Sequence, residues 1–95
     1  SLTVLDSRAV ATYQDIEWEV VLFKGTTRRS STIRANIGAG VTPVWLEDGI
    51  VINPAIGGTF DFVVNVDISG GNMRLTVTPS TTGWAARTRA RALAV

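Results

Sequence analysis

Apolar and polar residues alternate one by one along several stretches of this chain. A period of two is typical of β-strands that bury one face. The alternation is clearest in residues 16–23 (IEWEVVLF), 28–37 (RRSSTIRANI), 59–68 (TFDFVVNVDI) and 73–78 (MRLTVT), and a short apolar stretch at 2–5 adds an opening strand. These segments predict antiparallel strands whose inward residues form a common core.

Turn signals separate the predicted strands. Residues 24–27 (KGTT) and 69–72 (SGGN) fit hairpin loops, because glycine tolerates the positive backbone torsions of tight turns. Residues 7–14 are mostly small and polar, and we expect them to form a connection.

The stretch 38–58 contains several glycines and two prolines, and its pattern is less regular. It holds two short apolar runs, 44–46 and 50–52, separated by Glu47-Asp48-Gly49. A sequence of this kind between apolar runs predicts a tight turn. We therefore expect a long excursion with two short edge strands.

The last segment, residues 84–95 (WAARTRARALAV), is compatible with two structures. Alanine and arginine favour a helix by propensity, whereas Arg87, Arg89 and Arg91 recur with a period of two. On a helix these arginines would spread over about 200° and interrupt any apolar face, so we predict a strand. The chain is then expected to be all-β: one antiparallel β-sandwich, jelly-roll-like, of about seven strands, in a single domain over residues 1–95.

Composition narrows the possible functions. The chain has no cysteine and no histidine, which removes thiol nucleophiles, Fe–S clusters and the usual general base and metal ligand. Nine basic residues against eight acidic ones give a net charge of +1, too small an excess to attract nucleic acid or an anionic membrane. No apolar run is long enough to span a membrane. We expect a protein that is not an enzyme and binds no cofactor, no specific nucleic acid and no membrane.

Two sets of acidic residues have both a chemical and a structural interpretation. Glu17 and Glu19 would lie about 6.8 Å apart on one strand face, a spacing found between glycosidase carboxylates, but parallel side chains do not flank a bond. Asp61, Asn65 and Asp67 also share a strand face, and a straight strand spreads the oxygens that Ca²⁺ needs to converge. We interpret both sets as strand-surface residues, and a small hydrolase using Glu17 and Glu19 is kept as the least favoured alternative.

Arg87, Arg89 and Arg91 form a row of guanidinium groups if their segment is a strand. Arginine suits planar contacts with carboxylates and phosphates, often at interfaces. The row could contact phosphate, lipopolysaccharide or an acidic protein surface. It could also pair with Glu17 and Glu19 on a neighbouring strand, pair with carboxylates of another subunit, form a solvated face, or contact nucleic acid. Pairing, within the chain or between subunits, is favoured.

The apolar runs of the excursion are the candidate contacts with a partner. Tryptophan is enriched at interaction hot spots, and Trp45 could be an exposed anchor there. The candidate interface, which includes the arginine row as its polar part, consists of Val44, Trp45, Leu46, Ile50, Val51, Ile52, Arg87, Arg89 and Arg91.

Two parts of the chain carry a family resemblance. The first is Leu5-Asp6, a polar connection, the amphipathic stretch 13–23, the turn at 24–27 and the arginine-rich return from Arg28. The second is the run 60–78 with its Ser-Gly-Gly-Asn turn, followed by a Thr/Gly turn and the alanine- and arginine-rich end. Both resemble a small β-domain of tailed-bacteriophage virion structural proteins, whereas residues 38–58 depart from that pattern.

The resemblance implies a structural role and no catalytic residues. Taken as a complete small protein, the chain is expected to be a capsid decoration or cement protein that docks across subunit seams. Its partners would be other virion proteins, the major capsid protein or a tail protein, and it would form a homo-oligomer such as a trimer. The expected location is the virion, after synthesis in the host cytoplasm. The alternative is a receptor- or glycan-binding module of a tail fibre or tail tip.

Overall fold

The computed structural model describes residues 2–38, 42–53, 62–79 and 83–94. These residues form seven β-strands and no helix, so among them there is no helix that could cross a membrane. The strands are β1 (Thr3–Ala9), β2 (Tyr13–Lys24), β3 (Thr27–Asn36), β4 (Val44–Asn53), β5 (Phe62–Ser69), β6 (Asn72–Pro79) and β7 (Ala85–Ala94).

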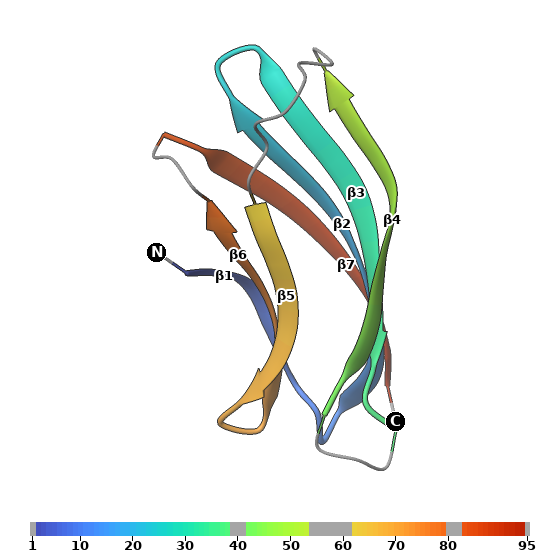
Figure 1. The fold of residues 1–95 in the computed structure, drawn as a ribbon. Helices are drawn as coiled ribbons and strands as arrows, with labels where there is room; N and C mark the ends of the chain where they lie inside the picture. Colours follow the sequence, from blue (N-terminus) through green and yellow to red (C-terminus); the bar gives the residue numbers. More distant parts are fainter. Residues whose placement is uncertain (1, 39–41, 54–61, 80–82, 95) are drawn as a thin grey trace.

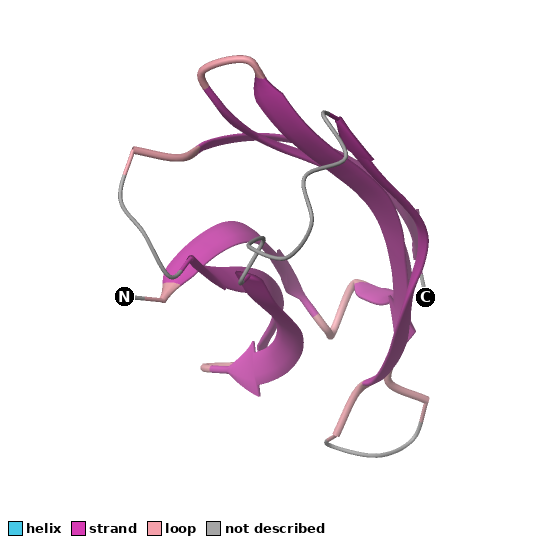
Figure 2. Cartoon of the chain, turned by 45° about the horizontal axis from the view of Figure 1, so that its top comes forward, coloured by secondary structure: helices cyan, strands magenta, loops and turns pink. Residues whose placement is uncertain are grey.

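The strands form two antiparallel sheets that face each other as a β-sandwich (Figure 1). Sheet A has the order β1-β6-β5, and sheet B has the order β4-β3-β2-β7. Figure 2, seen more from the top, shows the two layers with their inner faces turned toward one another. The all-β prediction and the sandwich are confirmed, as is the strand, rather than helix, in the C-terminal segment.

Both predicted hairpin turns are present. Lys24 pairs with Thr27, which leaves a two-residue loop that begins with Gly25 at φ 60°. Ser69 pairs with Asn72, and Gly70 and Gly71 between them have φ values of 59° and 78°. Two consecutive residues with positive φ match the right-handed twist of the flanking strands.

The core lies between the sheets and follows the alternation of the sequence. On β2, β3 and β6 buried residues alternate with more exposed ones, apart from Thr76, which is also buried, and β5 contributes buried Val66. Trp45 and Trp84 are half-buried and pack against the buried cluster. The cluster comprises Ile16, Trp18, Val20, Leu22, Ile33, Ala35, Val66, Met73, Leu75 and Val77.

The predicted turn at Glu47-Asp48-Gly49 is wrong. Residues 44–53 form one strand, β4, which pairs with β3 along its length. Ser30 pairs with Val51 and Thr32 with Asp48, so two residues of β4 oppose one residue of β3. This is a β-bulge, and Gly49 adopts a φ of 63° within it. The long edge of β3 offers backbone partners to both apolar runs, and the glycine absorbs the extra residue instead of reversing the chain.

The predicted connection at residues 7–14 is also shorter than expected. β1 continues to Ala9 and β2 begins at Tyr13. Polar residues in β1 join the sheet because Ser7 pairs with Arg74 and Ala9 pairs with Asn72 on β6. Pairing with a central strand thus overrides the local preference of small polar residues for a loop.

Candidate interaction surface

The outer face of sheet B is a broad four-stranded surface of mixed polarity. Its members are the outward residues of each strand, which alternate with the buried ones, and the pairing register places them in five rows across the sheet. From β4 to β7 the rows are Val44–Asn36–Asp15–Leu93, Leu46–Arg34–Glu17–Arg91, Asp48–Thr32–Glu19–Arg89, Val51–Ser30–Val21–Arg87 and Asn53–Arg28–Phe23–Ala85.

Six of the nine candidate interface residues share this face. On the edge strand β4, Val44, Leu46 and Val51 are 72%, 68% and 60% exposed. The second group, Arg87, Arg89 and Arg91, lies on β7 at the opposite edge of the sheet. The two groups are therefore separated by β3 and β2, a distance of about 14 Å at ordinary strand spacing.

The other three candidates are placed differently. Ile50 lies in the bulge and is half exposed. Ile52 and Trp45 alternate with the outward residues of β4 and are only partly exposed. Because Trp45 packs against the core cluster, it is not the exposed anchor that the sequence suggested.

The arginine row lies beside acidic residues of β2, as the sequence suggested. Glu17 pairs in register with Arg91, and Glu19 pairs with Arg89. One ion pair of 3.9 Å joins Arg89 Nε to Glu19 Oε2, and both side chains are well exposed. Exposed pairs of this kind add little to stability, so these charges remain available to a partner.

Two arginines, one of them from the arginine row, flank the aromatic ring of Phe23 on this face. Arg28 lies with its Cζ atom 5.4 Å from the centroid of the Phe23 ring, and the Arg87 Cζ atom lies at 5.7 Å. Arg28 comes from β3 and Arg87 from β7, the two strands on either side of β2. Cation–π contacts hold the planar guanidinium groups against the aromatic ring. The apolar side chain of Phe23 therefore lies between two positive charges on this face.

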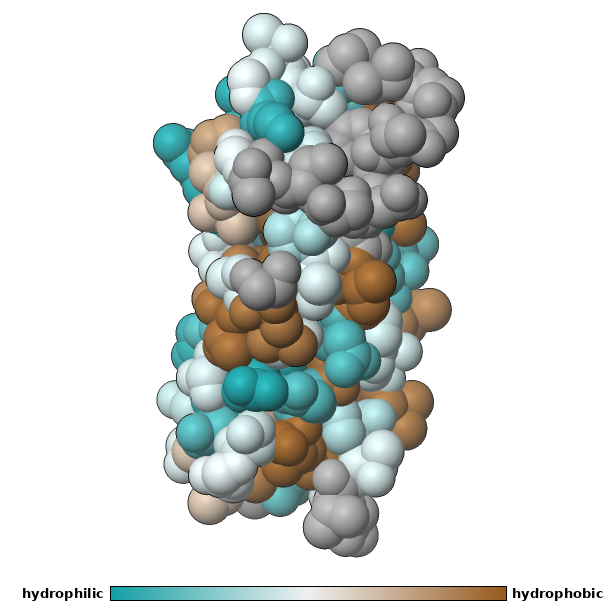
Figure 3. Space-filling model, turned by 60° about the vertical axis from the view of Figure 1, so that its left-hand side comes forward, coloured by the Kyte–Doolittle hydropathy of each residue, from teal (hydrophilic) through white to brown (hydrophobic). Residues whose placement is uncertain are grey.

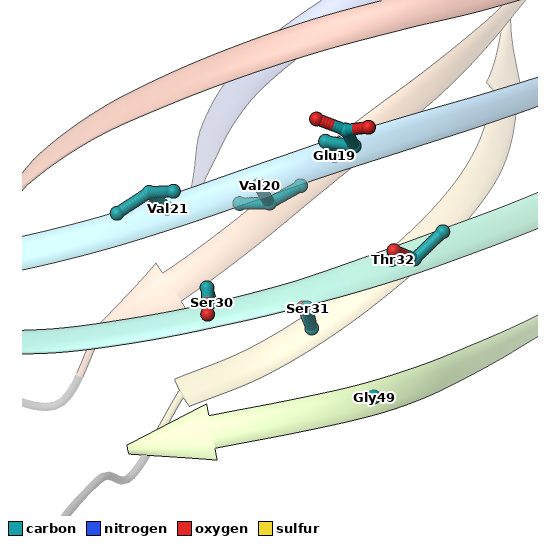
Figure 4. Close-up of a pocket in the computed structure, with 7 residues that line it drawn as sticks. All are labelled: Glu19, Val20, Val21, Ser30, Ser31, Thr32 and Gly49. Carbon is teal, nitrogen blue, oxygen red and sulfur yellow. The ribbon is translucent and has the colours of Figure 1, made fainter. Parts of the chain in front are cut away.

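The face carries shallow depressions rather than a deep cleft. One of about 200 Å³ lies at the bulge, where Gly49 has no side chain (Figure 4). Figure 4 shows Glu19 and Val21 on β2 and Ser30 and Thr32 on β3 around it. A second depression, of about 310 Å³, is lined by Asp15, Glu17, Arg34, Arg91 and Leu93. Such relief suits side chains of a partner surface better than an enclosed small molecule.

A buried ion pair lies behind the face, on the inner side of sheet B. Arg29 donates from Nη1 and Nη2 to the two carboxylate oxygens of Glu47, at 2.8 and 3.0 Å. The Ser31 hydroxyl also donates to Glu47, at 2.7 Å. Burial opposes ionisation of this carboxyl, but the hydrogen bonds from Arg29 and Ser31 and the charge of Arg29 outweigh it, so the pKa of Glu47 lies below its ordinary value. The ion pair links the side chains of the edge strand β4 and its neighbour β3 and so stabilises their pairing.

Sheet A also carries an ion pair, between Asp67 and Arg74. On the side that carries this sheet, hydrophobic and hydrophilic groups are interspersed (Figure 3). Asp67 accepts two hydrogen bonds of 2.8 Å from Arg74, which lower the pKa of the Asp67 carboxyl. Asp61, the first member of the predicted acidic strand face, lies outside the described residues. Within the described parts of the chain, no three His, Cys, Asp or Glu residues come together as metal ligands do.

Sequence reasoning missed the central part of the face and the buried pair. Alternation placed Arg28 and Arg34 on an outward face, but the neighbours of that face depend on register. The signal for the buried pair was Arg29. It lies two residues before Ser31 and four before Ile33, so it lies on the same inward face of β3. A buried arginine needs a carboxylate partner.

A comparison of the chain with protein-family models found no match. A comparison with curated proteins found no match either.

Proposed function

We propose that this chain is a non-enzymatic structural protein of a bacteriophage virion, and that it acts through protein–protein contacts made by the outer face of sheet B. The observation that carries the proposal is the composition of this face: Val44, Leu46 and Val51 are exposed at one edge, arginines of β3 lie beside them, and the arginine row of β7 lies at the opposite edge. Arginine and apolar side chains together are typical of protein interfaces. The resemblance to small phage β-domains supplies the virion as the setting.

As a capsid decoration or cement protein, the chain stabilises the shell by covering seams between subunits. Each apolar side chain that loses contact with water contributes roughly 25 cal/mol per Å² of apolar surface. A contact of a few hundred Å² is weak by itself because association has its own entropic cost. Many copies on one lattice act together, and their combined affinity then exceeds that of a single contact.

The glycan-binding alternative has less support. A stacking platform needs an aromatic ring whose face is open to solvent. Trp45, the residue on which that alternative rested, packs against the core cluster instead. Phe23, the aromatic side chain on the outer face, has guanidinium groups at its ring.

The proposal is tested by locating the protein on virions. We expect antibodies against this chain to label purified particles of the phage that encodes it, and added protein to co-sediment with particles that lack it. Exchange of both Val44 and Leu46 for Ser is expected to weaken co-sedimentation, because these exposed side chains take no part in the core. The matched control is Val63→Ser, an equally exposed valine on sheet A. Particles that carry no label and bind none of the protein would end the proposal.

A further inference from the structure

The charges on the outer face of sheet B are arranged by strand. β2 is acidic and lies between two basic strands, while the outward residues of β4 are apolar except for Asp48 and Asn53. The acidic residues are Asp15, Glu17 and Glu19 on β2 and Asp48 on β4, and the basic residues are Arg28 and Arg34 on β3 and Arg87, Arg89 and Arg91 on β7. Read across the sheet, the order is apolar, basic, acidic, basic.

This order is complementary to itself under one two-fold rotation. Consider an axis in the plane of contact, parallel to the strands and midway between β2 and β3. Rotation about it lays β3 of one copy over β2 of the second copy, and β4 over β7. The basic strand β3 then faces the acidic strand β2, and the apolar edge faces the arginine row.

The register shows that oppositely charged residues meet, because this rotation keeps each row opposite itself. In the second row, Arg34 faces the partner's Glu17. In the central row, Asp48 faces the partner's Arg89. No row sets two side chains of like charge against each other.

The two end rows match apolar and aromatic groups, while the fourth row sets Val51 against the partner's Arg87. At one end of the face, Val44 meets the partner's Leu93, and these side chains are 72% and 63% exposed in the single chain. At the other end, Arg28 meets the partner's Phe23, so the cation–π contact present within one chain is repeated between chains. The exposed apolar residues of both edges are thereby covered.

The other rotation that aligns the strands lacks this match. An axis perpendicular to the strands lays each strand over its own copy. Arg89 of β7 would then lie near the partner's arginines, and the acidic strand β2 would lie on the partner's acidic strand. Repulsion between like charges disfavours this arrangement. The charge pattern therefore selects a single orientation.

We propose that the outer face of sheet B binds the same face of a second copy of this chain, in a two-fold dimer whose axis runs parallel to the strands between β2 and β3. The inference rests on the proposed function in one respect, that this face makes protein–protein contacts. Because the dimer and a virion contact would use the same face, the dimer is the form of the protein that is not docked on a particle. Four strands with five outward residues each cover about 600 Å². A dimer would bury about 1,200 Å² in total, the lower limit for specific interfaces, so the dimer forms reversibly.

Asp48 and Arg89 provide the sharpest test. Within one chain they lie on opposite edges of sheet B, about 14 Å apart, whereas they face each other in the dimer. Both are exposed, and they lie in the central row, where two twisted sheets packed within about 30° of each other stay best aligned. A change in their mutual charge therefore affects the dimer, while the monomer loses only two exposed contacts, the Arg89–Glu19 ion pair and the hydrogen bond from the Gly49 N–H to Asp48 Oδ1.

The experiment measures the mass of the purified protein in solution over a wide concentration range by analytical ultracentrifugation. The wild type is expected to shift from one chain to two as concentration rises. Asp48→Arg and Arg89→Asp each place like charges against each other, and each should raise the dissociation constant of the dimer more than about tenfold. The double variant restores opposite charges and should dimerise again, as should an equimolar mixture of the two single variants. Val63→Arg, on sheet A, is the control and should leave dimerisation unchanged.

A wild type that stays a single chain at every concentration would overturn the inference. So would a folded double variant, and a mixture, that fail to recover the dimer. The two proposals can fail separately. A protein that is found on virions but stays a monomer in solution would support the virion role and contradict the dimer. A protein that dimerises as described but never binds particles would support the dimer and contradict the virion role.

Discussion

A single carboxylate, Asp6, joins the two sheets through the largest buried side chain. Trp18 of sheet B is completely buried, and its indole Nε1–H donates to Asp6 Oδ2 on β1 at 2.7 Å. Arg8 donates to the same oxygen at 3.0 Å. The register shift at Leu5 allows this contact, since it lets Leu5 pack on the core and the next residue, Asp6, also turn inward.

Replacement of Asp6 by Ala should therefore destabilise the fold. The indole N–H of Trp18 would be buried without an acceptor, which costs about 1–3 kcal/mol. Asp6→Asn keeps an acceptor oxygen and should lose less. Arg8→Ala removes a partly exposed ion pair and a cation–π contact of 5.9 Å with the Tyr13 ring, and it should cost about 1 kcal/mol. Urea unfolding followed by far-UV circular dichroism measures each value, and equal losses for Asp6→Ala and Arg8→Ala would contradict the role given to the indole.

At the scale of elements, the edge strands of the sandwich carry features that limit pairing with other chains. β7 presents Arg87, Arg89 and Arg91, and charged side chains along an edge oppose the addition of another strand. β1 and β4 each contain an irregularity, at Leu5 and at Gly49, which twists the edge. Three of the four edge strands, β1, β4 and β7, thus carry a feature that opposes pairing, while the outer face of sheet B is open to a partner.

Gly49→Ala tests the bulge of β4. No atom lies within 4 Å of a Cβ built at this position, so any cost comes from the backbone. A residue with a side chain at a φ of 63° loses about 1–2 kcal/mol relative to glycine. Gly49→Asn should lose less, since asparagine tolerates the left-handed region. Thermal unfolding provides the comparison, and an Ala variant as stable as the wild type would rule out the bulge as described.

At the scale of the whole molecule, acid should weaken the fold. Glu47 and Asp67 both have pKa values below their ordinary ones because arginine side chains bind their ionised forms. For a lowered pKa, the added stability is complete above the unfolded value, 4.5 for Glu47, and is lost as the pH falls through the folded value. We expect a plateau at neutral pH and a decline in acid.

Glu47→Gln isolates the buried pair. At neutral pH it should cost about 3 kcal/mol, because it leaves the Arg29 charge buried without a counter-ion. The difference from wild type should shrink as the pH falls from 4.5, the ordinary pKa, through the lower pKa of the folded protein, because the wild-type carboxyl is then neutral too. The control is Glu19→Gln, an exposed carboxylate whose loss should have little effect. A difference for Glu47→Gln that did not change with pH would mean that its charge is unimportant.

Much of the fold could be predicted because β-structure shows itself in short-range patterns. Alternation identified the inward residues of β2 and β6, and paired glycines located the turn at residues 69–72. The turn predicted at Glu47-Asp48-Gly49 failed for a physical reason. Glycine at positive φ serves a turn and a bulge equally well, and the choice between them depends on whether a neighbouring strand provides backbone partners.

The sequence by itself determined the class of fold, the faces of most strands and the row of arginines, because these depend on residues one or two positions apart. Only the tertiary structure decided which strands are neighbours and in what register they pair. Register put Glu19 beside Arg89, Phe23 between Arg28 and Arg87, and Arg29 against Glu47. The candidate surface exists only after these distant segments have paired, since a sheet face is assembled from strands that the sequence keeps apart.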